Sequence, residues 1–274
     1  MMVLSRRSVV YMLLVSVLVL MLSPLAWLAI TAFKDSTELS AVPIHWWPHN
    51  PSPGNFGKAL TSWDYFGFAR NSLTIAVIYS VLATLASAWA GYGFARLEAP
   101  GKRVIFGVLL STMMLPQVIT LIPTYLLFAK VNLINTYMPW VLWGMCGAPY
   151  LIFLFRQFFS NMPKELEEAA IVDGCGQIRI FWRIFLPQSW PVIATSVILS
   201  FSWTWGDFIA PALLLDTNRT TLAVQLTYGY MNAHGGQLNN LVAAGALVYV
   251  VPVLVLFLIL QRGFVAGIST SGLK

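Results

Sequence analysis

One acidic side chain in this sequence combines chemical reactivity with a setting where reactivity would matter. Asp207 lies inside an apolar run, within the segment 201–208. A charged group is costly in such a run, and proteins that keep one there commonly use it in their mechanism. We expect Asp207 either to hydrogen-bond to a neighbouring helix or, with Trp205, to line a translocation path.

The other reactive residue types form no recognisable constellation. The three histidines, His45, His49 and His234, show no H-E-x-x-H spacing. The two cysteines, Cys146 and Cys175, give no disulfide framework or metal cluster. We assign no catalytic residue and no metal ligand, so an intrinsic enzyme is not expected.

A phosphate loop for ATP is also missing from the sequence. The basic segment at residues 100–103 has the wrong spacing for G-x-x-x-x-G-K-[ST] and lacks the hydroxyl residue that follows the lysine. This chain is therefore expected to carry no cofactor, and any ATP that drives it would bind elsewhere.

The composition indicates a membrane protein. Of 274 residues, 58% are hydrophobic and 9% charged, whereas soluble domains carry about a quarter charged residues. Apolar runs of about 20 residues cross the bilayer as helices, and such runs are too long for barrel strands. We predict an all-α membrane bundle forming one domain over 1–274, with six spans at about 9–33, 71–95, 104–128, 137–156, 191–215 and 241–261.

The distribution of basic residues predicts the orientation. The formal charge is +6, but the 16 Lys and Arg are scattered at the ends of apolar runs, which argues against a nucleic-acid stripe. More of them fall in the connections on the side of both termini, so the positive-inside rule places both termini in the cytoplasm. The run at 9–33 is too long for a typical signal-peptide core, and we interpret it as an uncleaved span.

Two segments on the other side are long. The first, at about 34–70, contains Trp46 and Trp47 among several prolines, which suits either a docking surface or simple anchoring of helix ends. The second, at about 216–240, is polar, and nothing in it dictates a ligand.

The segment between the fourth and fifth spans predicts a helical hairpin at 161–187. Pro163 and the acidic residues that follow it favour a helix start, and Gly174 favours a left-handed turn at its end. A narrow face of small residues, at Leu166, Ala169 and Ala170, would allow close approach by a partner. A second amphipathic stretch is expected from about 177 to 186, before Pro187.

This hairpin resembles the signature of ABC importer membrane subunits. The pattern E-A-A, three residues, G, nine residues, I-x-L-P matches Glu168-Ala169-Ala170, Gly174 and Ile184-Phe185-Leu186-Pro187. The flanking segments at 71–73, 91–97, 100–103, 115–116, 121–125, 133–137 and 262–274 are similar to the carbohydrate-uptake subfamily, in particular to its second maltose-permease-like subunit. The tail departs from the usual ending at Ser271 and Leu273.

The resemblance implies a type I importer permease fold in a bacterial plasma membrane, with a coupling helix at 163–174. It implies that the coupling residues are Glu168, Ala169, Ala170, Asp173, Gly174, Leu186 and Pro187. The implied partners are a homologous second permease, two ATPase subunits that bind ATP and Mg, and an extracytoplasmic solute-binding protein. We expect Glu168 to pair with a basic ATPase residue or with Arg179 or Arg183.

The solute stays open at this stage. Maltose-like, trehalose-like, amino-sugar and glycerophosphodiester solutes all fit the resemblance. The competing interpretations are an ATP-independent secondary transporter or channel, which would need ionisable relays or inverted repeats, and a membrane-embedded enzyme.

Overall fold

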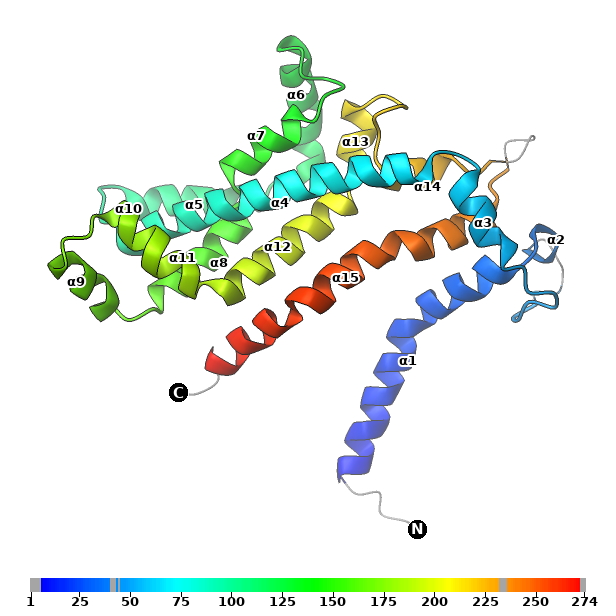
Figure 1. Ribbon diagram of the computed structural model, residues 1–274, viewed down its shortest axis with the longest axis horizontal. Coiled ribbons are helices and arrows are strands. Elements are labelled where there is room, and N and C mark those ends of the chain that lie inside the picture. The colour runs from blue at the N-terminus through cyan, green and yellow to red at the C-terminus, as the bar shows by residue number, and fades with distance from the viewer. Residues whose placement is uncertain (1–5, 40–42, 44, 232–235, 272–274) are drawn as a thin grey trace. The chain divides into compact units, whose positions relative to one another are not determined.

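The computed structural model describes residues 6–39, 43, 45–231 and 236–271 (Figure 1). Within these ranges every extended regular element is a helix, and one isolated antiparallel bridge joins Met231 to Gln237. The predicted all-helical class is therefore confirmed. His234 and the tail residues 272–274 lie outside the described residues.

The chain forms two compact units, one of residues 1–67 and 225–251 and the other of residues 68–224 and 252–274. The first unit contains α1 (Arg6–Phe33), α2 (Ser36–Leu39) and α3 (Gly54–Thr61), together with parts of three helices that both units share. These shared helices are α4 (Tyr65–Arg96), α14 (Leu222–Tyr228) and α15 (Asn239–Ser271).

Two tyrosine hydroxyls hold the first unit together. Tyr65 donates a hydrogen bond to the carbonyl of Gly245 at 2.8 Å, and Tyr230 donates one to the carbonyl of Ala59 at 2.7 Å. Both tyrosines are buried, and a buried hydroxyl without a partner would be costly. The two bonds therefore tie the α3 region to a segment far along the chain.

A buried lysine fixes the end of α1. Lys34 is 2% exposed, its Nζ donates to the carbonyl of His45, and the same atom lies 4.7 Å from the ring centroid of Trp27. Asn55 donates from its side-chain nitrogen to the carbonyls of Ala32 and Lys34, at 2.9 and 2.8 Å. The chain after α1 is thus packed onto the end of that helix.

The second unit contains the remaining helices. In chain order these are α5 (Lys102–Thr112), α6 (Gln117–Lys130), α7 (Met138–Cys146), α8 (Pro149–Ser160), α9 (Glu165–Val172), α10 (Gln177–Ile180), the π-helical turn η1 (Phe181–Phe185), α11 (Leu186–Gln188), α12 (Trp190–Trp205) and α13 (Ile209–Leu214). Helix α8 packs against α5 and α12, and α6 packs against α13.

Three of the apolar runs that the sequence indicates as single spans are divided. The run at 104–128 is split between α5 and α6, because Pro116 has no backbone donor to continue the helix. The run at 137–156 is split at Gly147, whose φ is 71°. The run at 191–215 breaks after Trp205, before α13 begins.

Four described helical segments are long and apolar enough to cross a membrane, namely Val9–Phe33, Tyr65–Arg96, Met138–Ser160 and Asn239–Gln261. A fifth candidate is the pair Gln177–Gln188 and Trp190–Trp205, which is bent by 79°. The α6 segment Val118–Lys130 is apolar but shorter. Six spans remain a prediction.

Candidate functional site

The hairpin at 161–187 contains α9 and α10, and α9 lies at one end of the second unit, beyond α10 (Figure 1). Three glutamates occupy the first turn of α9, where the positive end of the helix dipole stabilises them. Gly174 follows the helix with a φ of 76°, and its N–H donates to the carbonyl of Ile171 at 2.9 Å. The predicted short helix and left-handed glycine turn are both present.

The burial pattern of α9 separates two faces. Ala170 is 5% exposed and packs into the aromatic core of the unit, and Glu167 on the same side is half-buried. The exposed face carries Glu165, Glu168, Ala169 and Val172, which recur at the spacing of one helical stripe.

The burial of Ala170 limits how much of the predicted small-residue face a partner can reach. Ala169 lies about 100° round the helix from Ala170 and is exposed. Ala170 is committed to packing within this chain, whereas Ala169 is available to a partner. Val172 replaces Ala170 on the available face, and its side chain is 87% exposed.

Arg96, at the end of α4, anchors the hairpin. Its Nη2 donates to the carbonyls of Phe159, at 2.7 Å, and Met162. Its Nη1 lies 3.8 Å from a carboxylate oxygen of Glu167, and its guanidinium carbon lies 5.0 Å from the ring centroid of Phe185. One buried cation therefore connects four segments of the second unit.

A cluster of aromatic rings lies beneath this arginine. Tyr92 lies 5.0 Å from Phe185 and 5.4 Å from Phe181, measured between ring centroids, and Phe159 lies 5.6 Å from Phe185. The Tyr92 hydroxyl donates to the side-chain oxygen of Gln177 at the start of α10. The cluster and this bond hold both arms of the hairpin against α4.

Glu168 makes no ion pair with Arg179 or Arg183 in the described part of the chain. The ion pair of the hairpin instead joins Glu167 to Arg96. Asp173 is exposed and ends α9. Of the two predicted pairings of Glu168, the one within the hairpin is therefore not formed.

The second arm of the hairpin extends past Pro187. The N–H of Leu186 donates to the carbonyl of Phe181, which is the longer repeat of a π-helical turn. Because of this turn, Pro187 lies in the first turn of α11. The first N–H groups of a helix have no acceptor within the helix, so a proline there costs no helical hydrogen bond. The sequence predicts that the second arm ends before Pro187. The π-helical turn explains why the helix continues through this residue.

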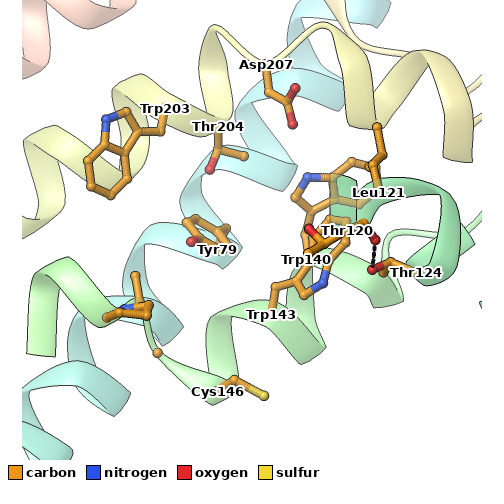
Figure 2. Close-up of a pocket in the computed structure, with 13 residues that line it drawn as sticks. Tyr79, Thr120, Leu121, Thr124, Trp140, Trp143, Cys146, Trp203, Thr204 and Asp207 are labelled. Atoms are coloured by element: carbon orange, nitrogen blue, oxygen red, sulfur yellow. Dashed lines mark hydrogen bonds between the residues drawn. The ribbon is translucent and has the colours of Figure 1, made fainter. Parts of the chain in front are cut away.

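A cavity of about 600 Å³ lies within the second unit (Figure 2). Four aromatic side chains line it, and these are Tyr79, Trp140, Trp143 and Trp203. Three threonines, Thr120, Thr124 and Thr204, add polar groups, and the free thiol of Cys146 also borders the space. Mixed aromatic and polar walls of this kind are typical of small-molecule sites.

Asp207 contributes its carboxylate to this cavity. It lies in the break between α12 and α13, and so not within a helical span. Its Oδ1 accepts hydrogen bonds from the N–H groups of Ile209 and Ala210, at 3.0 and 3.3 Å. Asp207 therefore has a local structural role and also faces the cavity.

Trp205, in contrast, does not line the cavity. It is 3% exposed and stacks on Phe201, with ring centroids 5.7 Å apart. The tryptophan on the cavity wall is Trp203. A place for Trp205 on the translocation path stays a prediction, because a uniformly apolar helix carries no periodic signal that singles out one of its faces.

Comparison with known proteins identifies the family. The family of binding-protein-dependent transport system inner membrane components matches residues 83–269 of this chain. The chain belongs to this family. The matched region contains the whole hairpin and every cavity residue named above except Tyr79.

Similar proteins of this family include three bacterial permeases. A probable ABC transporter permease, YurM of Bacillus subtilis, is 34% identical over 92% of this chain and 83% of its own length. An arabinooligosaccharide permease, AraQ of Halalkalibacterium halodurans, is 33% identical over 92% and 90%. A melibiose/raffinose/stachyose import permease, MelC of Bacillus subtilis, is 32% identical over 92% and 91%.

A solved structure shares the fold. A chain of a bacterial ABC transporter involved in alginate import superposes with a TM-score of 0.77 at 18% sequence identity, over 96% of this chain and 99% of that chain. The protein is therefore a multi-pass plasma-membrane permease subunit of an ABC importer and a translocation component, and the comparisons do not favour an ATP-independent transporter.

Proposed function

We propose that this permease subunit carries a sugar or sugar-like solute into the cytoplasm. The observation that carries the proposal is the set of oligosaccharide permeases among its relatives, which match over nearly the whole chain. The aromatic and threonine walls of the cavity support it, because sugars present both apolar C–H faces and hydroxyl groups.

Helix α9 acts as the coupling helix. Its exposed stripe offers Ala169 and Val172 after Glu165 and Glu168, and an apolar residue that is 87% exposed on a solvated hairpin favours burial against a partner. Ala169 lets the partner backbone approach closely, and Glu168 pairs with a basic residue of the ATPase. Asp173 and Gly174 set the end of the helix and the direction of the turn.

The remaining signature residues act from inside the hairpin. Ala170 and Leu186 pack on the aromatic cluster, and Pro187 follows the π-turn at the bend towards α12. These residues make the hairpin rigid, so a displacement imposed on α9 passes to α4 and α12 without being absorbed locally.

The chain crosses the membrane six times, with both termini in the cytoplasm. The broken runs α5–α6, α7–α8 and α12–α13 each act as one passage with an internal interruption. Interrupted helices are tolerated at membrane depth where the freed backbone groups are buried in protein or line a cavity. Two of these breaks, at Gly147 and near Asp207, do line the cavity.

The working complex contains a second homologous permease, two cytoplasmic ATPase subunits that bind ATP and Mg, and an extracytoplasmic solute-binding protein. Closure of the ATPase pair moves α9, and the shift exchanges outward-facing and inward-facing states of the cavity. The solute-binding protein favours one of these states, which makes transport directional.

Reconstitution tests this proposal. The complex in proteoliposomes, supplied with its solute-binding protein and ATP, should accumulate a radiolabelled oligosaccharide such as raffinose or an arabinooligosaccharide. Purification through this subunit should also recover an ATPase chain in a fixed ratio. A complex that accumulates no sugar from a broad panel would refute the substrate class, and a subunit purified without any ATPase would refute the coupling role.

A further inference from the structure

The described residues that line the cavity carry negative charge and no positive charge. Among the described residues that line it, Asp207 is the only charged side chain, and the others are aromatic, hydroxyl-bearing or apolar. No lysine, arginine or histidine of that set compensates the carboxylate. A negatively charged solute would therefore meet a like charge beside protein walls, where Coulomb repulsion is stronger than in bulk water.

Two backbone hydrogen bonds hold one oxygen of the Asp207 carboxylate. Both backbone hydrogen bonds go to Oδ1, which leaves Oδ2 outside these two contacts. In Figure 2 the carboxylate extends from the break after α12 into the space that the labelled side chains surround. A carboxylate held in this way accepts short, charge-assisted hydrogen bonds from O–H or N–H donors.

From this geometry we propose that the cavity selects its solute by charge. It accepts neutral or cationic sugars through their hydroxyl or ammonium hydrogens, and Asp207 excludes anionic ones. The inference rests on the proposed sugar uptake and narrows it, because it removes the glycerophosphodiesters that the sequence left open. The aromatic walls add to the preference, since ring faces attract cations and apolar C–H groups but not anions.

A cysteine on the cavity wall allows the effect of Asp207 to be measured by thiol labelling. Cys146 lies on its wall, and the only other cysteine of the chain is Cys175 in the hairpin. In the assembled complex with Cys175→Ser, the rates of labelling this subunit by two methanethiosulfonates are compared. One reagent carries a trimethylammonium group and the other a sulfonate, and each forms a mixed disulfide with the thiol.

The ratio of the cationic rate to the anionic rate is the decisive quantity. We expect Asp207→Asn to lower this ratio about tenfold, because losing the negative charge slows the cationic reagent and speeds the anionic one by about threefold each. The asparagine oxygen can still accept from Ile209 and Ala210, so the local fold should persist. Asp207→Glu should keep a high ratio, and Glu98→Gln, which removes a charge that does not line this cavity, should leave it unchanged.

Failure of charge selection and failure of the proposed sugar uptake give different results. Equal ratios in the wild type and Asp207→Asn would overturn charge selection even if the complex imports a sugar. A normal drop in the ratio, in a complex that imports no sugar, would leave charge selection standing and refute the proposed substrate class.

Discussion

Arg96 and Glu167 form a buried ion pair that links the end of α4 to the inner face of α9, with Nη1 and Oε2 3.8 Å apart. Their side chains are 5% and 15% exposed. The arginine also donates hydrogen bonds to two main-chain carbonyls. Replacing the arginine therefore removes more interactions than replacing the glutamate. This asymmetry leads to the first prediction.

Arg96→Met should destabilise the subunit by about 3 kcal/mol, because it leaves Glu167 as an uncompensated buried charge. Glu167→Gln should cost about 1–2 kcal/mol, since the arginine keeps its carbonyl acceptors. The thermal midpoint of the purified complex measures both changes. Glu98→Gln, at an exposed position outside the hairpin, is the control and should change stability little. Equal effects of Arg96→Met and Glu98→Gln would contradict the anchoring role.

Gly174→Val should uncouple ATP hydrolysis from solute uptake. No atom lies within 4 Å of the position that a Cβ would occupy, so the cost comes from the backbone alone. A β-branched residue at a φ of 76° costs about 1–2 kcal/mol or more. Gly174→Asn should behave more mildly, because asparagine tolerates the left-handed region.

The control for Gly174 is two residues away. Gly176 has a φ of −76° and equally open surroundings, so Gly176→Ala should retain normal solute uptake per ATP hydrolysed. The measurement is that transport ratio in proteoliposomes. Loss of coupling in Gly176→Ala, or full coupling in Gly174→Val, would show that the turn geometry is not what matters.

Gly91→Ala should separate α4 from α8. A Cβ there would lie 2.6 Å from the Cβ of Phe155 and 2.9 Å from the backbone nitrogen of Arg156, and neither atom can move without shifting α8. Overpacking of this kind costs about 1–3 kcal/mol. Gly93→Ala, on the same helix with no atom within 4 Å, should be neutral or stabilising. Thermal unfolding of the two variants side by side checks the order, and a reversed order would refute the close packing.

Replacing Trp203 should impair solute uptake, whereas replacing Trp205 should destabilise the protein. Trp203 lines the cavity and is 46% exposed, so Trp203→Ala should raise the solute concentration needed for half-maximal uptake while the complex stays folded. Trp205→Ala removes a buried ring and should cost about 3–5 kcal/mol of stability. Uptake curves and thermal midpoints distinguish the two, and an unchanged half-saturation in Trp203→Ala would remove that ring from the solute path.

The sequence predicted the helical class and the hairpin because both rest on strong local signals. Long apolar runs require helices, and Pro163, the glutamates and Gly174 each act within a few residues of themselves. The family resemblance at the hairpin agreed with the later comparison over residues 83–269.

The sequence could not predict which side of a helix is buried where hydrophobicity is uniform. Trp203 and Trp205 look alike in an apolar run, and Ala169 and Ala170 differ only in what the rest of the chain brings near them. For Arg96 the sequence indicates only a basic residue near a helix end. Its anchoring role depends on carbonyls more than 60 residues away, which no local pattern encodes.

Photocrosslinking from Val172 tests the central claim most directly. With benzoylphenylalanine at this exposed position of α9, the assembled complex should yield a covalent product with the ATPase chain on irradiation. The same group at Met114, which is 83% exposed between α5 and α6, should yield none. A complex that contains the ATPase but gives no product from Val172, or gives as much from Met114, would contradict the assignment of α9 as the coupling helix.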